Sequence, residues 1–384
     1  MEFGFPNSIN PLILTNRNED PDRVFAMVKQ VQLDFMKATL SKKMLSICLV
    51  LLCQIFLTCE RKNQMMPPND EIKASSKLYV ANSGSNTISV IDADSDEVIQ
   101  TIVVGQQPSA MTFSSPRKQL YISNFLSKNI SSVDVLTDMK IDDFEAGGVP
   151  LKMDIYLQNR LLVLIQRDTI NYWDRPIIVM DLDTKAKIDT LELSNPCAYL
   201  NAFAIVSDGK LFGTGFHGPF CDFIPTTPLI YGLTERRILG YMTLAGTELV
   251  LSSDEKLICI VGQLHSNFVF DIKRSRYAKV GGIPSLGGYD SLKHAAFSVA
   301  KQKIYISEPM TRSLLIVNSS SYAIEDTIVL GFTPASLVVS MDERKLYISA
   351  PNENQVTVFD LETKKVAKLI PVGQEPKDMV AVNL

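Results

Sequence analysis

A unit of about 40 residues repeats along most of this chain, and this repetition limits the possible folds more than any other feature. The first copy, 77–113 (KLYVANSGSNTISVIDADSDEVIQTIVVGQQPSAMTF), contains four short apolar runs separated by turn residues. With the Tyr of its Leu-Tyr pair as a marker, further copies follow at intervals of about 40 to 50 residues. The marker positions are Tyr79, Tyr121, Leu162, Phe212, Ile258, Tyr305 and Tyr347. Repeats of this length are typical of propellers and solenoids.

Turn residues recur at fixed places in the repeat. An Asp follows the second apolar run in five copies, where its carboxylate can accept backbone N–H bonds and start a hairpin turn. These residues are Asp92, Asp134, Asp181, Asp271 and Asp360. A Gly-x-x-Pro motif precedes the next copy at Gly105, Gly147, Gly331 and Gly373, where Gly permits a positive φ and Pro fixes φ. Seven copies, each long enough for four short strands, predict an all-β fold, a seven-bladed β-propeller over 77–384.

The ends of the repeat region predict how the ring closes. Each copy begins at the second strand of a blade, and the chain ends in PKDMVAVNL, which has the pattern of an innermost strand. We therefore expect this C-terminal strand to pair with Lys77–Asn82 in the N-terminal blade. Such pairing removes an open sheet edge.

Three copies carry a family resemblance: LYVANSGSNTISVID, LYISNFLSKNISSVDV and LYISAPNENQVTVFDL. They resemble the YVTN-type repeat of surface-layer and periplasmic propellers, over about 80% of the chain by repeat count. The resemblance implies a seven-bladed propeller. Because members of this family differ widely in role, it implies fold more than function.

The region before the repeats has three parts. Residues 1–35 show no repeat and are interpreted as a disordered stretch before the true start. Residues 36–59 combine lysines with an apolar run at 44–58, which predicts a secretory signal too short for a span of about 20 residues. Its end, FLTC, resembles a bacterial lipobox with departures at Phe56 and Thr58. This favours lipidation of Cys59, and the alternative is an ordinary signal peptide cut near that residue. Residues 60–76 are polar and predict a linker.

Composition and cysteine usage narrow the compartment and the partners. The formal net charge is −4, and no basic and aromatic pattern follows the signal, so nucleic acid is not expected as a partner. An exported chain permits a disulfide, and the hypothesis is that Cys197 pairs with Cys221, while the alternative leaves both thiols free. Cys259, in an apolar strand, is interpreted as a buried free thiol.

Two long loops between second and third strands, 166–176 and 213–228, predict one candidate site. Adjacent blades would place them on one face, where aromatic and charged side chains would form a recognition surface. Its residues are Tyr172, Trp173, Asp174, Arg175, Phe216, His217, Phe220, Asp222 and Phe223. The alternative is a small apolar core under the two loops.

The loops that enter the innermost strands predict a second candidate site at the mouth of the central channel. It would gather Gln107, Lys152, Glu248, Asp290, His294 and Lys377. Such groups either bind a ligand on the propeller axis or solvate a narrow channel.

Signals for metals and catalysis are few. The sequence contains no Gly-x-Ser-x-Gly, His-Glu-x-x-His or P-loop motif. His217, His265 and His294 lie in different copies, and each is interpreted as a single polar residue rather than a metal ligand. The run 92–97 (DADSDE) imitates the start of a calcium loop without its Gly and distal Glu, so a solvated turn is favoured over a calcium site. No cofactor is expected.

Two classes of function remain open. In the favoured one, the chain is an exported, lipid-anchored, monomeric scaffold that binds a protein or glycan at the bacterial cell envelope. Glu60 is not the Asp linked with inner-membrane retention in some bacteria, so the outer membrane is favoured. The alternative is a propeller enzyme of lactonase or quinoprotein-dehydrogenase type with its site at the central channel.

Overall fold

The computed structural model describes residues 76–167, 174–193, 198–217, 229–241, 246, 248–261, 267–280 and 294–384. The predicted signal, the predicted linker before residue 76 and Cys59 lie outside the described residues. The compact unit Ala74–Leu384 contains all strands considered below. Among the described residues, no helix has the length and apolar character needed to cross a membrane.

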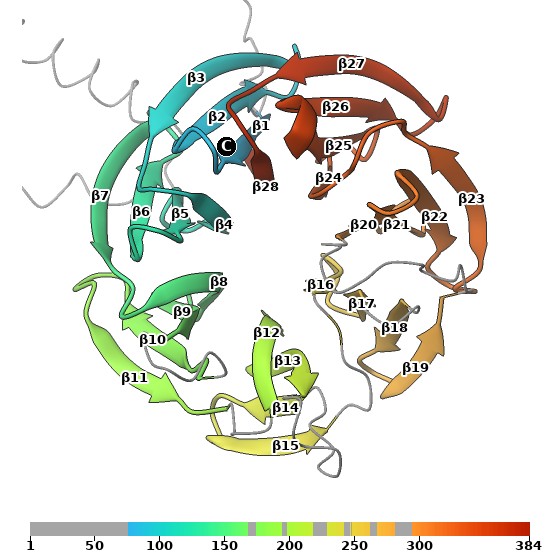
Figure 1. Ribbon diagram of the computed structural model, residues 1–384. Helices are drawn as coiled ribbons and strands as arrows, with labels where there is room; N and C mark the ends of the chain where they lie inside the picture. Colours follow the sequence, from blue (N-terminus) through green and yellow to red (C-terminus); the bar gives the residue numbers. More distant parts are fainter. Residues whose placement is uncertain are drawn as a thin grey trace, which may run out of the picture. The chain divides into compact units, whose positions relative to one another are not determined.

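Seven four-stranded antiparallel sheets form the ring of a β-propeller, so the predicted fold is confirmed (Figure 1). We name the sheets blades A to G, in order around the ring. Blade A has the inner-to-outer order β28 (Pro376–Asn383), β1 (Ser76–Asn82), β2 (Thr87–Asp92), β3 (Glu97–Val103). Blade B has β4 (Pro108–Ser114), β5 (Gln119–Asn124), β6 (Asn129–Asp134), β7 (Met139–Glu145). Blade C has β8 (Val149–Tyr156), β9 (Arg160–Gln166), β10 (Ile177–Asp181), β11 (Lys187–Leu191).

The other four blades repeat this order. Blade D has β12 (Ala198–Ile205), β13 (Lys210–His217), β14 (Leu229–Gly232), β15 (Arg237–Tyr241). Blade E has β16 (Glu248–Leu251), β17 (Leu257–Val261), β18 (Phe268–Asp271), β19 (Arg276–Lys279). Blade F has β20 (Ala295–Ser298), β21 (Lys303–Glu308), β22 (Ser313–Asn318), β23 (Ile324–Val329). Blade G has β24 (Leu337–Val339), β25 (Lys345–Ala350), β26 (Gln355–Asp360), β27 (Lys365–Pro371), with the short 3-10 helix η2 (Pro351–Glu353) after β25.

The ring closes through the C-terminal strand, as predicted. β28 pairs with β1 in an antiparallel register that runs from Ser76 opposite Asn383 to Asn82 opposite Pro376. The C-terminal strand β28 therefore supplies the inner strand of blade A, and the first three strands, β1 to β3, supply the other three (Figure 1). Without β28, β1 would be left as an open inner edge of blade A.

The core lies between blades rather than within one. Successive residues of a strand point to opposite faces of its sheet. Tyr79 and Ala81 of β1 accordingly pack against blade B, whereas Leu78 and Val80 pack against blade G. Among the described residues, seven apolar clusters of this kind fill the seven interfaces. Each fully buried Leu, Ile or Val contributes roughly 1.5–3 kcal/mol.

The strand register corrects one marker of the repeat. Lys77 pairs with Asp92 in blade A, and the equivalent pair in blade E joins Leu257 to Asp271. The residue equivalent to Tyr79 is therefore Cys259 and not Ile258. A single-residue offset of this kind exchanges the two faces of a strand.

The turn prediction is confirmed where an Asp ends the third strand. The Asp92 carboxylate accepts bonds from the backbone N–H groups of Asp94 and Ser95 at 3.1 and 2.8 Å. The same type of bond forms at Asp134, Asp181, Asp271 and Asp360. In blade F, the side chain of Asn318 takes this role.

The glycines of Gly-x-x-Pro serve two purposes rather than one. Gly147 and Gly331 have positive φ angles of 81° and 82°, as the motif predicts. Gly105 does not, because the positive φ lies at Gln107. A Cβ at Gly105 would lie 2.5 Å from Ser127 Oγ, so this glycine permits the close approach of two loops.

Candidate functional site: a layer of charged residues on the propeller axis

One position recurs in the inner strand of every blade, or just before it. It lies opposite the residue of the second strand that comes two places after the repeat marker, for example opposite Ala81, which follows Tyr79. In blades A to E this position faces Ala81, Ser123, Leu164, Thr214 and Val261. In blades F and G the backbone N–H groups of Ser307 and Ser349 bond to its carbonyl. In order around the ring the seven residues are Asp378, Ala110, Lys152, Ala202, Glu248, His294 and Ser336. We call this set the axial layer.

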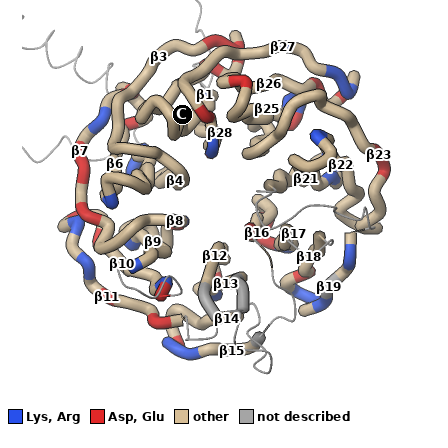
Figure 2. The backbone as a smooth tube through the Cα atoms, viewed as in Figure 1, with Lys and Arg blue, Asp and Glu red and all other residues tan. Residues whose placement is uncertain are grey.

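The axial layer concentrates titratable groups where the inner strands otherwise carry few. Figure 2 shows that charged residues lie mainly on the outer strands and connecting turns. The inner strands of blades B, D, F and G contain no Asp, Glu, Lys or Arg. Four of the seven axial-layer residues nevertheless can carry charge. They therefore face one another around the axis at a single level.

Lys152 forms an ion pair across this layer. Its ammonium bonds to Glu248 Oε1 at 2.6 Å, although β8 and β16 belong to blades separated by blade D. The intervening position is Ala202, whose small side chain leaves room for the lysine to cross. Lys152 and Glu248 keep 30% and 17% of their side-chain surface exposed, so solvent reaches the pair. Burial disfavours the ammonium, but the charges of Glu248 and Asp378 outweigh it and raise the pKa of Lys152.

Asp378 is held from both neighbouring blades. Its Oδ2 accepts a bond from the backbone N–H of Met111 at 2.8 Å, and its Oδ1 accepts one from Ser336 Oγ at 3.4 Å. Burial raises the pKa of this carboxyl above its usual value, while the nearby charges of Lys152 and His294 oppose the shift. A buried carboxyl with a raised pKa and basic neighbours is a candidate proton donor or acceptor.

A second acid lies two residues further along β8. Burial raises the pKa of Asp154 to about 6, against bonds from the Ile155 and Ile205 backbone and the charge of Lys152. The layer and Asp154 together contain one lysine, one histidine and three carboxyl groups within the inner strands or at their ends. These groups can donate and accept hydrogen bonds to a bound polar molecule from several sides.

The structure brings together part of the predicted channel mouth. Lys152, Glu248 and His294 belong to the axial layer, whereas Gln107 uses its backbone N–H to bond Asn86 in a turn. Lys377 lies in a β-bulge of β28, and Asp290 lies outside the described residues.

Sequence reasoning missed Asp378 because of this bulge. Ala81 pairs with Asp378 and Asn82 with Pro376, so Lys377 is the extra residue and has no partner on β1. Bulges at the same place occur in β4, β8 and β12. The residue second after the Gly-x-x-Pro proline could have identified the axial layer, because it follows the bulge in blades A, B and C.

The predicted loop face is only partly described. Tyr172, Trp173, Phe220, Asp222 and Phe223 lie outside the described residues, as do Cys197, Cys221 and His265. Asp174 accepts bonds from Arg167 Nη1 at 3.1 and 3.2 Å, and Arg175 bonds to the side chain of Asn201. Phe216 and His217 lie at the end of β13, opposite Tyr199 and Ala198 of β12. The recognition surface stays a prediction.

Two smaller predictions concern cysteine and metals. Cys259 is a buried free thiol, as predicted, and burial raises its pKa to about 12. In the calcium-like run, Asp92 accepts the turn bonds described above and Asp96 bonds to Lys345 and Tyr347 of blade G. No group of three or more His, Cys, Asp or Glu side chains able to hold a metal ion is found among the described residues.

Comparisons with known proteins give the fold. No family model matches the chain. The uncharacterized protein YwhL of Bacillus subtilis (strain 168) is 22% identical over 317 residues, which are 81% of this chain and 65% of that protein. This chain thus spans less than two thirds of its relative.

The solved structures that are similar to this propeller include two that show the range of proteins with this fold. Hydrazine synthase of Kuenenia stuttgartiensis has a TM-score of 0.61 and 17% identity, covering 74% of this chain and 92% of that one. The periplasmic gluconolactonase of Pseudomonas aeruginosa has a TM-score of 0.62 and 14% identity, covering 80% and 99%. At such identities the likeness shows a shared β-propeller fold, and the chemistry must be argued from this chain's own residues.

Proposed function

We propose that this protein is an exported, lipid-anchored propeller that binds a small, polyhydroxylated molecule at the axial layer. One observation carries the proposal: four titratable residues occupy equivalent positions around the axis, and the lysine among them lies between two alanines. Polar groups that converge from separate strands are typical of ligand sites in propellers and barrels.

The charges of the layer favour a ligand with several hydroxyl groups. Lys152 can donate to a ligand oxygen, whereas Glu248 and Asp378 can accept from hydroxyl hydrogens. Because the ammonium already lies 2.6 Å from Glu248, a singly charged anion would compete with that carboxylate. A neutral sugar or sugar lactone satisfies donors and acceptors without adding a charge.

The test is binding of glucose and of gluconolactone to the purified full chain, measured by isothermal titration calorimetry. The informative variant is His294→Gln, since His294 faces the layer and makes no side-chain hydrogen bond within the described structure. We expect it to weaken binding about tenfold, or about 1.4 kcal/mol. The matched variant Lys377→Met, at the bulge next to Asp378, should bind as the unmodified protein does. Absence of saturable binding of both probes would contradict the proposal.

Lactone hydrolysis is a second candidate, favoured by the position of Asp378 in the axial layer, where Met111 and Ser336 hold its carboxyl and burial raises its pKa. In that reaction a water oxygen bonds to the lactone carbonyl carbon, the ring C–O bond breaks, and the ring oxygen takes up a proton to give a hydroxy acid. Asp378 would accept the proton of the attacking water. A gluconolactone hydrolysis assay separates the candidates, because a binding protein saturates with gluconolactone without releasing acid above the uncatalysed rate.

A further inference from the structure

A recurring contact, here called the clamp, joins neighbouring blades on the face that carries the turns after β16, β18, β20 and β22. In the A–B interface, Lys77 Nζ and Tyr79 Oη both donate to the Asp138 carboxylate at 2.6 Å. Asp138 is the fourth residue after β6 and has a positive φ of 54°. The two donors come from the start of the second strand of the preceding blade. The clamp thus bonds one blade to the turn of the next.

The same clamp closes the G–A interface. Lys345 Nζ and Tyr347 Oη donate to Asp96 at 2.7 and 2.9 Å, and Asp96 also has a positive φ, of 55°. Lys-Leu-Tyr in the sequence therefore encodes a bond between blades. The repeat predicts the same contact in every interface where these residue types persist.

The E–F interface has lost all three members of the clamp. Strand register places Leu257 and Cys259 where Lys77 and Tyr79 stand in blade A. The turn position of Asp138 is held by Tyr322, with a positive φ of 59°. Among the residues that line this interface on the clamp face, no hydrogen bond or ion pair passes from blade E to blade F. The two blades remain joined by apolar packing deeper in the interface.

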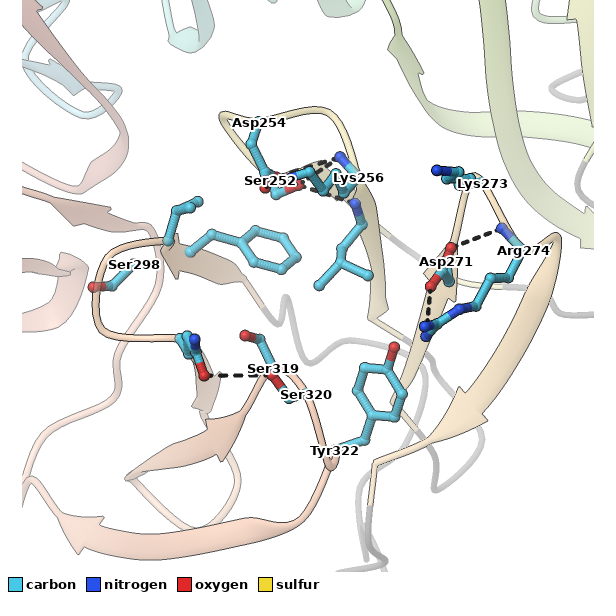
Figure 3. A pocket seen from close by; sticks show the side chains of 14 residues that line it. Ser252, Asp254, Lys256, Asp271, Lys273, Arg274, Ser298, Ser319, Ser320 and Tyr322 are labelled. Atoms are coloured by element: carbon cyan, nitrogen blue, oxygen red, sulfur yellow. Dashed lines mark hydrogen bonds and ion pairs between the residues drawn. The ribbon is translucent and has the colours of Figure 1, made fainter.

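A cleft of about 780 Å³ opens at this place, lined by fourteen residues from four turns and the adjoining strand ends (Figure 3). Its volume lies within the range of small-molecule sites, roughly 300–1,000 Å³. Leu257 and Phe297 supply apolar surface, while serine hydroxyls come from both blades. Figure 3 shows the Tyr322 hydroxyl directed into the cleft, toward Asp271 and Arg274.

The charges around the cleft leave an excess of one positive group. Lys256 pairs with Asp254 at 2.8 Å, and Arg274 pairs with Asp271 at 3.4 Å. The exposed Lys273 makes no hydrogen bond or ion pair within the described residues. An anion in the cleft therefore meets an uncommitted ammonium beside a guanidinium that is 74% exposed.

We propose that the E–F cleft binds a small organic anion that carries an aromatic or apolar group. The apolar part lies against Phe297 and Leu257, and the anionic group lies between Lys273 and Arg274. This site is on a blade interface away from the axial layer and is independent of the function proposed there. Among the residues that line this cleft no clamp crosses it, and the basic turn of blade E supplies the charge.

The test uses the fluorescent probe anilinonaphthalenesulfonate, which has an aromatic body and one sulfonate, titrated into the full chain. We expect saturable binding at one site and much weaker binding of the uncharged anilinonaphthalene. The variant Lys273→Glu should weaken the binding of the sulfonate probe about tenfold. Lys279→Glu is the control, because Lys279 is an exposed lysine on the outer strand of the same blade and does not line the cleft.

A second variant rebuilds part of the clamp. Leu257→Lys with Tyr322→Asp recreates the ion pair of Lys77 and Asp138 and places a carboxylate in the cleft. We expect the probe to be lost while the melting temperature stays the same or rises, which separates loss of the site from loss of the fold. Unchanged probe affinity in this variant, or equal weakening by Lys273→Glu and Lys279→Glu, would overturn the proposal.

Discussion

Replacing the lysine of the axial layer tests most directly whether that layer is a coupled electrostatic unit. In Lys152→Met the side chain keeps its length and apolar stem but loses the ammonium. Glu248 then loses a partner at 2.6 Å, and Asp378 loses a neighbouring positive charge. Glu248 is then left without an ion-pair partner among the described residues, whereas Asp378 keeps its bonds from Met111 and Ser336.

The structure sets the size of the effect. Two unit charges about 4 Å apart attract by about 4 kcal/mol at an effective dielectric constant near 20. Removing one partner of a fully buried pair costs about 3–5 kcal/mol, whereas an exposed pair contributes about 0–1 kcal/mol. Because Lys152 is 30% exposed and Glu248 is 17% exposed, the pair lies between these limits. We expect Lys152→Met to lower the free energy of unfolding at pH 7 by about 2–3 kcal/mol.

Urea denaturation of a double-mutant cycle measures this directly. The double variant Lys152→Met with Glu248→Gln removes both charges, so it should be less destabilised than the sum of the single variants by at least about 1 kcal/mol. Lys377→Met is the matched control. Because Lys377 lies in a bulge and has no charged partner among the described residues, this variant should change stability by less than about 0.5 kcal/mol. Equal effects of Lys152→Met and Lys377→Met, or additive single effects in the cycle, would refute the reasoning.

Three further predictions follow from other contacts. Burial raises the pKa of Asp154 from 3.8 to about 6. The contribution of Asp154 to the free energy of unfolding is therefore complete below pH 4 and is lost as pH rises through 6. Asp154→Asn should remove about 2–3 kcal/mol of this pH dependence, measured by urea denaturation from pH 4 to 7. Tyr347→Phe removes a bond to the Asp96 carboxylate at 2.9 Å and should destabilise the fold by about 1–3 kcal/mol, whereas Tyr305→Phe, which removes no such bond, should be close to neutral in thermal unfolding. Deleting Met379–Leu384 removes most of β28 and should give insoluble protein; a soluble monomer with an unchanged melting temperature would contradict the closure argument.

The architecture could be predicted from sequence because its signals are local. The hairpin Asp after the third strand and the Gly-x-x-Pro turn each act within a few residues, and both recur often enough to count blades. Ring closure could also be predicted, because each sequence repeat begins at the second strand of a blade and the chain ends with the pattern of an innermost strand. The predicted marker of blade E, Ile258, was wrong. The strand LICIV is apolar at every position, so no alternation of apolar and polar residues shows which side chains share a face. Only strand pairing identifies Cys259 as the residue equivalent to Tyr79.

The candidate site was harder to predict because it depends on bulges. Alternation along PKDMV does not say whether Lys377 or Asp378 is the extra residue, and only pairing with β1 decides. The contact of Lys152 with Glu248 joins residues 96 apart in sequence and crosses a whole blade. No local sequence pattern predicts this contact. An alignment of the repeats would have placed Lys152 and Glu248 at equivalent positions.

Departures from the repeat locate both proposed sites, but they do so for different physical reasons. A structural repeat needs equivalent residues to make equivalent contacts, and the E–F interface is joined by its apolar core without a clamp. The axial layer is a stronger case, since alanine is compatible with the same position in blades B and D. Placing Lys152, Glu248 and Asp378 there costs desolvation that apolar residues would avoid. A ring that can close with alanine but carries charge on its axis supports the proposal of a ligand that needs those charges.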